Sequence, residues 1–118
     1  MIFRLLVLVM VGSMISHNAF SEDKTFNSEV VQVLVDDSNY GGCMVRLSVD
    51  PQTQLANCGS QFASLDCLKQ FPESTAGIAA NKLAQAQLAL VTGREVRLRI
   101  TDTRKVNGYC FVNRIDVK

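Results

Sequence analysis

Histidine is nearly missing from this chain of 118 residues, which contains a single one, His17. His17 lies in an N-terminal segment that we expect to be removed, so the remaining protein has no imidazole. Without imidazole, Ser-His-Asp and Cys-His nucleophile systems and the usual catalytic zinc sites are excluded. We therefore expect a protein that is not an enzyme. The alternative is a histidine-free enzyme with two carboxylates facing one cleft, about 5–10 Å apart.

The chain also lacks a large net charge of either sign. The chain has 12 Lys and Arg residues against 11 Asp and Glu residues, and without Arg4 the two counts are equal. Bulk electrostatics therefore do not predict nucleic-acid binding. There is no glycine-rich phosphate loop, and the DDSNYGG stretch lacks the terminal bidentate acid of a calcium loop. We expect no cofactor and no bound metal.

Residues 1–21 have the features of a secretory signal peptide. Arg4 supplies the positive charge, Leu5–Ile15 is the apolar run, and Ala19–Ser21 fits a cleavage site. The run is shorter than the roughly 20 residues of a membrane-spanning helix, although a retained anchor is the alternative. No later stretch is apolar enough to span a bilayer. We predict a secreted or periplasmic protein in which residues 22–118 form one domain.

Hydrophobic periodicity predicts five strands in this domain. They are expected at Val30–Val35, Cys43–Val49, Gln61–Leu68, Glu95–Thr101 and Tyr109–Val117. The polar segments 22–27 and 51–59 are expected to be a loose arm and a loop. Asn107-Gly108 predicts a tight turn before the last strand, because both residue types tolerate a positive φ.

One helix is predicted over Ala76–Val91. Ser74 or Thr75 is expected to cap its first turn, and Gly93 stands where a C-terminal glycine cap belongs. Apolar residues recur at helical spacing and are expected to face the core, namely Ile78 or Ala79, Leu83, Ala86 or Gln87, and Leu90.

The predicted element order is β-β-β-α-β-β, mainly β with one helix. This is the order of the OB-fold, a small five-stranded Greek-key barrel. A generic α+β sheet with a helix on one face is the alternative.

An even number of cysteines behind a signal peptide predicts two disulfides. In an OB-fold the second and third strands are antiparallel, whereas the third and fifth are parallel. This pairing favours Cys43–Cys67 and Cys58–Cys110, because each pair is then brought together. Cys43–Cys58 with Cys67–Cys110 is the alternative, since spacing alone does not fix connectivity.

Recognition is the remaining class of function, and two polar turn clusters are the candidate binding residues. The first contains Asp36, Ser38, Asn39 and Tyr40. The second lies within residues 101–109, with Asp102, Arg104 and Tyr109 as its candidate contacts. Short polar side chains beside an aromatic ring suit a sugar, whose hydroxyls accept and donate hydrogen bonds. The alternative is that both clusters are ordinary turns.

The segment Leu83–Ile100 (LAQAQLALVTGREVRLRI) resembles the helix-to-strand segment of B subunits in subtilase-cytotoxin-like and pertussis-like AB5 toxins. Cys43 and Cys67 also resemble the cysteines that bridge the second and third strands there. The resemblance implies an OB-fold that assembles into a ring pentamer and binds a cell-surface glycan. Without it, the alternative is a monomeric periplasmic or secreted structural or inhibitor-like protein that binds another protein.

Overall fold

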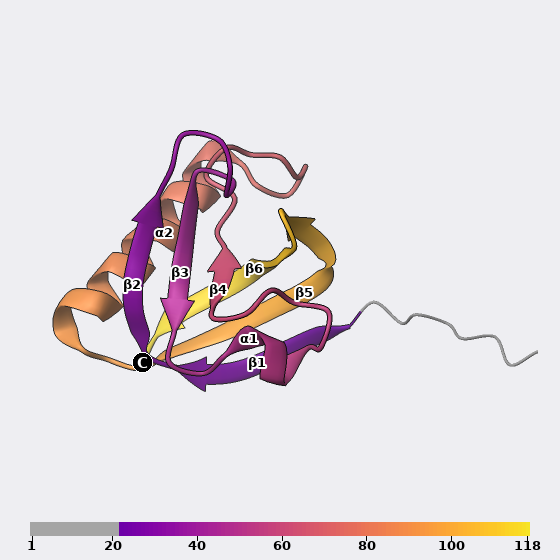
Figure 1. Cartoon of the computed structure of the whole chain (residues 1–118). Coiled ribbons are helices and arrows are strands. Elements are labelled where there is room, and N and C mark those ends of the chain that lie inside the picture. Colours follow the sequence, from indigo (N-terminus) through magenta and orange to yellow (C-terminus); the bar gives the residue numbers. More distant parts are fainter. Residues whose placement is uncertain (1–21) are drawn as a thin grey trace, which may run out of the picture.

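The computed structural model describes residues 22–118, and the predicted signal peptide lies outside the described residues. Six strands and two helices follow one another along the chain (Figure 1). They are β1 Asp23–Ser28, β2 Val30–Val35, β3 Cys43–Leu47, α1 Pro51–Gln54, β4 Phe62–Ser64, α2 Ala76–Thr92, β5 Val96–Val106 and β6 Tyr109–Val117. Neither helix of this described part is long and apolar enough to cross a membrane.

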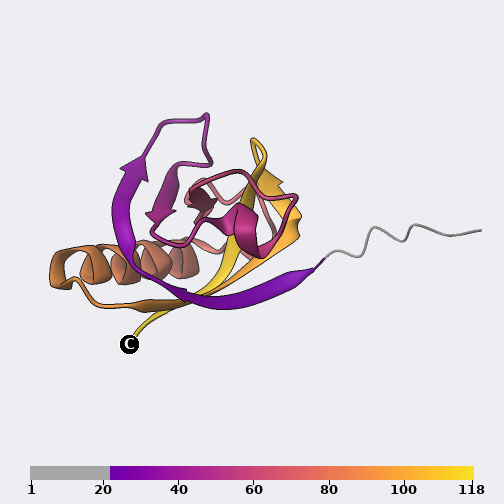
Figure 2. The ribbon, with the colours of Figure 1, turned by 60° about the horizontal axis from the view of Figure 1, so that its bottom comes forward.

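All six strands belong to one mixed sheet in the order β1-β5-β6-β4-β3-β2. The pairing of β4 with β6 is parallel, and the other pairings are antiparallel. Only Glu29 separates β1 from β2, so the two edge strands of the sheet are consecutive in the chain. Figure 2 shows them as one curved band that runs along the rim of the sheet.

The hydrophobic core lies on one face of the sheet, as the period-two patterns predict. On β3, Cys43, Val45 and Leu47 are buried in the core, whereas Arg46 is exposed. On β5, Val96, Leu98 and Ile100 are fully buried between charged neighbours. Helix α2 packs against β2 and β6 and covers this core.

Helix α2 begins and ends where its capping residues predict. The Thr75 hydroxyl accepts a hydrogen bond from the Ile78 N–H, and Gly93 has a left-handed φ of 68°. The face that it buries agrees with the prediction at Ala79 and Ala86, and at Leu83, which is partly buried against the core, and differs from it at Leu90. Ala79, Lys82, Ala86 and Ala89 are buried, whereas Ile78, Gln87 and Leu90 are exposed.

The two disulfides join the predicted pairs. Cys43 is bonded to Cys67, with their Cα atoms 5.4 Å apart, and Cys58 is bonded to Cys110, with their Cα atoms 5.1 Å apart. The first ties β3 to the segment that follows β4, and the second ties the segment before β4 to β6. The short strand β4 is therefore anchored on both sides.

The predicted strand Gln61–Leu68 is only the three-residue β4, and three segments predicted to be irregular form strand or helix. The expected loose arm is strand β1, whose polar residues pair with β5, and Asp23 forms an ion pair with Arg99 (Oδ2–Nη2 2.7 Å). The expected loop 51–59 contains the short helix α1, which Asp50 caps. The expected second turn cluster is largely strand, since β5 continues to Val106 through an irregularity between Thr101 and Lys105.

Candidate functional site

Three aromatic rings gather around a small cleft at the end of the sheet where the β2–β3 loop and the β5–β6 turn meet. The ring centroids of Tyr40 and Tyr109 are 6.1 Å apart, and those of Phe62 and Tyr109 are 6.2 Å apart, both edge to face. Leu34 and Met44 complete the lining of a cleft of about 150 Å³. We call these five residues the aromatic cleft.

Two turns place the tyrosines. Asp36 accepts hydrogen bonds from the N–H groups of Ser38 (2.9 Å) and Asn39 (2.8 Å), which folds the loop back so that Tyr40 reaches the cleft. These two hydrogen bonds lower the pKa of Asp36 below its ordinary value, and the bond from Ser38 has the larger effect. Asn107 and Gly108 both have positive φ, 50° and 85°, and turn the chain directly before Tyr109.

Gly59 makes room for the Tyr109 ring. A Cβ added at Gly59 would lie 2.5 Å from Cδ1 and 2.8 Å from Cε1 of Tyr109. The Gly59 N–H also donates to the Gly108 carbonyl at 2.8 Å, which holds this segment against the turn. The position of Tyr109 therefore depends on the absence of a side chain at residue 59.

A larger and more polar hollow lies on the same strands. It measures about 360 Å³ and is lined by Val31, Arg46, Leu47, Ser48, Asp50 and Gln61. The Arg46 guanidinium forms no ion pair within residues 22–118, and Arg46 is the cross-strand partner of Phe62 in the aromatic cleft. The polar hollow therefore borders the aromatic cleft.

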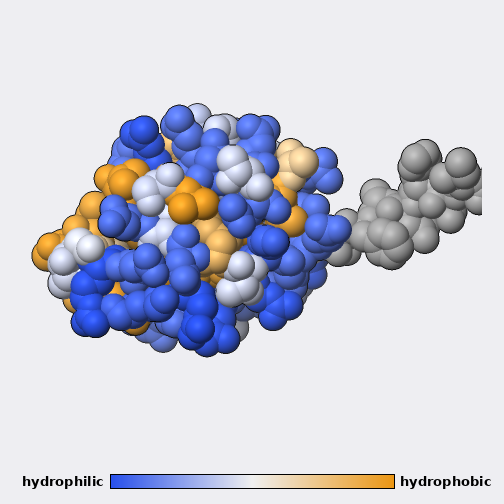
Figure 3. Space-filling model, turned by 90° about the horizontal axis from the view of Figure 1, so that it is seen from below, coloured by the Kyte–Doolittle hydropathy of each residue, from blue (hydrophilic) through white to orange (hydrophobic). Residues whose placement is uncertain are grey.

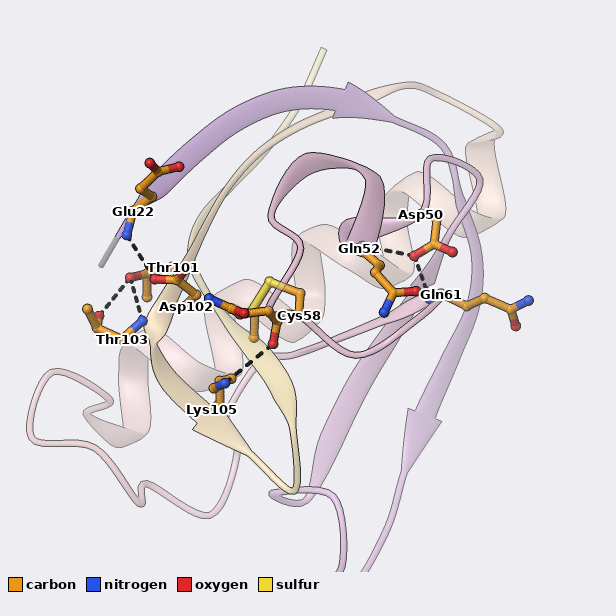
Figure 4. Close-up of a disulfide and its surroundings, with 11 residues drawn as sticks. Glu22, Asp50, Gln52, Cys58, Gln61, Thr101, Asp102, Thr103 and Lys105 are labelled. Carbon is orange, nitrogen blue, oxygen red and sulfur yellow. Dashed lines mark hydrogen bonds between the residues drawn. A yellow bond between two sulfur atoms is a disulfide. The ribbon is translucent and has the colours of Figure 1, made fainter. Parts of the chain in front are cut away.

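Asp50 is the carboxylate of the polar hollow, and its oxygens bind loop groups (Figure 4). Oδ1 accepts from the N–H groups of Gln61 (3.0 Å) and Gln52 (2.9 Å). Oδ2 accepts from the Ser60 hydroxyl (2.8 Å). The Gln61 bond is the main cause of the lowered pKa of Asp50. Gln61 itself has a φ of 71°, which this bond helps to hold.

The remaining predicted contacts of the second cluster have partners elsewhere. Arg104 pairs with Glu73 (Nε–Oε1 2.7 Å) and lies 5.7 Å from the centre of the Phe71 ring. Asp102 accepts from the backbone N–H of Glu22 at 2.8 Å, as Figure 4 shows. Of the predicted contact residues, Tyr40 and Tyr109 therefore line the aromatic cleft, and Asp36, Ser38 and Asn39 shape the loop beside it.

Sequence reasoning did not select Phe62, Met44, Leu34, Arg46 or Gln61. Met44 and Arg46 lie on the side of β3 that faces away from the core, a side expected to be solvated. Met44 and Phe62 are the feature of the sequence that could have indicated this site. Large apolar residues on the side of a strand that faces away from the core indicate a second contact surface.

A separate charged cluster lies near the first turns of α2. The Nζ atom of Lys82 stands 4.1 Å from the centre of the Phe111 ring. Burial lowers the pKa of Lys82, against the opposing effect of Asp66 and Glu73. Asp66 is fully buried and accepts from the N–H groups of Gln70 (2.9 Å) and Phe71 (3.0 Å). This cluster fastens the loop between β4 and α2 to the sheet.

No group of three or more His, Cys, Asp or Glu residues within 22–118 is placed to hold a metal ion. No family model, curated protein or solved structure matches this chain.

Proposed function

We propose that this protein is an exported binding module that holds a saccharide at the aromatic cleft. The observation that carries the proposal is the arrangement of Tyr40, Phe62 and Tyr109 around one cleft. Aromatic faces and edges pack against the C–H surface of a sugar ring. The bordering hollow supplies Arg46, Ser48 and Gln61 as hydrogen-bonding groups for hydroxyls.

We further propose that the sheet, which is not closed into a barrel, has the strand arrangement of an OB-fold. Strands β1 and β2 support this proposal. They follow one another in the chain and lie at opposite edges of the sheet, so they can be counted as one bent strand. With that count the order is three strands, a helix and two strands. OB-folds bind ligands on the face of their second and third strands and on the flanking loops. The aromatic cleft lies at the equivalent place, between β3, β4, the 36–42 loop and the 107–108 turn.

Two disulfides and a sheet-rich domain of this size support an oxidising location, secreted or periplasmic. The resemblance of Leu83–Ile100 to toxin B subunits supports a cell-surface glycan as the saccharide, in a B-subunit-like protein. The ring pentamer that the resemblance implies is the alternative to the dimer inferred below, and light scattering of the purified protein distinguishes the two.

A glycan array probed with the oxidised protein tests the saccharide proposal. We expect the wild-type protein and the Arg104→Ala variant to bind the same saccharides, because Arg104 pairs with Glu73 and does not line the cleft. Tyr40→Ala is expected to abolish binding. Absence of any bound saccharide, or unchanged binding by a folded Tyr40→Ala variant, would contradict the proposal.

The second candidate is a structural or inhibitor-like protein that binds another protein. It is favoured by the exposed hydrophobic side chains of Ile78, Leu88, Leu90 and Val91 on α2, none of which lines the aromatic cleft. The occupant of that surface is the subject of the next inference.

A further inference from the structure

The exposed hydrophobic side chains are concentrated on two neighbouring elements. Seven large hydrophobic residues of the described chain are exposed, and six of them lie on α2 or β2, which pack together. These six are Ile78, Leu88, Leu90 and Val91 on α2, and Val31 and Val35 on β2. In Figure 3 hydrophobic atoms gather on the left of the view, the side on which α2 lies in Figures 1 and 2.

The exposed surface of α2 carries no charge. Lys82 is the only charged residue among the 17 of the helix, and it is 8% exposed. The first turn has no acidic residue and the last turn has no basic one. A helix that faces water on one side normally has charged and polar residues there. The exposed polar residues of α2 are the uncharged Asn81, Gln87 and Thr92, so its exposed side is uncharged and largely apolar.

The sizes of the side chains on this exposed surface change along the helix. At 3.6 residues per turn, Ala76, Gly77, Ala80 and Ala84 share a face with Leu88 and Val91, and the uncharged Gln87 lies beside Ala76 and Ala80 on the same side. The first half of the face therefore has small side chains and forms a low surface, whereas the second half has large side chains and forms a raised one. A Cβ added at Gly77 would meet nothing within 4 Å, so the low half is open, and Val91 is 84% exposed. We call the six apolar residues the α2 face.

We infer that the α2 face packs antiparallel against the α2 face of a second copy of this chain, across a two-fold axis beside Ala84. In this arrangement Leu88 of one copy lies over Ala80 of the other, and Val91 lies over Gly77. Each raised half then fills the low half of its partner, as a two-fold interface requires.

Charge favours a second copy over an ionic partner. Lys69 lines a hollow beside Ala76 and Ala80, but the α2 face itself has no charge, so it does not repel its own copy and offers no ion pair to select an acidic protein. The helix is about 25 Å long and about 10 Å wide, which is a smaller footprint than the ~800 Å² per partner of a standard interface. We therefore expect a reversible dimer whose population rises with protein concentration.

Sedimentation velocity across a wide range of protein concentrations tests the dimer. We expect the mean mass to rise from that of a monomer towards that of a dimer. Ala84→Glu places two like charges at the axis and is expected to weaken dimerisation by roughly tenfold or more. Asn113→Glu makes the same change of charge at an exposed position of β6 and is expected to dimerise like the wild type.

Cross-linking through a single position tests the symmetry. With a short bis-maleimide, Ala84→Cys is expected to give a covalent dimer, because the two-fold axis brings residue 84 next to its own copy. This result does not depend on the folding of Ala84→Glu. A monomer at every concentration would overturn the inference. So would a pentamer, whose cyclic symmetry has no two-fold axis, or a dimer that a folded Ala84→Glu variant retains.

Discussion

Replacing Gly59 by alanine would place a Cβ 2.5 Å from the Tyr109 ring and 3.1 Å from the Gly108 carbonyl oxygen. Both distances are too short, so the ring must leave its position between Tyr40 and Phe62. Over-packing of this kind costs about 1–3 kcal/mol of unfolding free energy. For a domain of this size each kcal/mol lowers Tm by roughly 4–8 °C.

Urea unfolding and calorimetry measure this cost. Gly77→Ala, measured at a protein concentration low enough to keep the chain monomeric, is the control, since the added Cβ meets nothing within the same chain, and it is expected to be neutral or stabilising by up to about 1 kcal/mol. The cost of Gly59→Ala is expected to be smaller in a Tyr109→Ser background, because the obstructing ring is gone and only the contact with the Gly108 carbonyl oxygen remains. An unchanged Tm for Gly59→Ala, or an equal cost in both backgrounds, would refute the reasoning.

Three further predictions concern the disulfides and the titrating groups. Removing the Cys58–Cys110 disulfide, whose cysteines are 52 residues apart in the sequence, is expected to lower the free energy of unfolding by about 4 kcal/mol. Removing Cys43–Cys67, with a separation of 24 residues, is expected to lower it by about 3.5 kcal/mol. Urea unfolding of the two double alanine variants checks which disulfide contributes more. Burial lowers the pKa of Lys82 in the folded state, so between the folded pKa and the ordinary value of 10.5 this side chain is more protonated in the unfolded chain than in the folded one. The free energy of unfolding of the wild type should therefore rise with pH up to about 10.5. The Lys82→Met variant should not show this rise. The pKa of Asp50 is lowered from 3.8, so its stabilising effect is lost as pH falls below that value, and Asp50→Asn should flatten the acid side of the stability curve.

Much of the fold follows from local patterns in the sequence. The alternation of β3, the Thr75 and Gly93 caps of α2 and the Asn107-Gly108 turn predict elements that the structure contains. The disulfide pairs were predictable because two cysteines flank β4 and each neighbouring strand supplies one partner.

The elements that escaped prediction depend on tertiary contacts. β1 is polar and has little strand propensity of its own, and its structure comes from pairing with β5. The buried face of α2 was predicted correctly at Ala79, Leu83 and Ala86, but Leu90 was wrongly placed in it because large apolar residues are normally on the core side of a helix. Here alanines such as Ala86 and Ala89 pack against the core, and Leu88 and Leu90 remain exposed.

The candidate site was predictable only in its loops. Tyr40 and Tyr109 follow turn signals, so sequence reasoning found them. Phe62 and Met44 lie within strands, and their outward orientation became informative only when the register placed them beside the tyrosines. Arg104 is drawn to Glu73, a pairing across 31 residues that no local pattern indicates.

Chemical-shift mapping tests the central claim most directly, namely that the aromatic cleft is the binding surface. The oxidised, isotope-labelled protein is titrated with the saccharide that binds best on the array. The largest amide and aromatic shifts are expected at Tyr40, Phe62 and Tyr109, with smaller ones at Arg46 and Gln61. Shifts confined to α2 or to the Arg104–Glu73 region, with none at the three rings, would contradict the account.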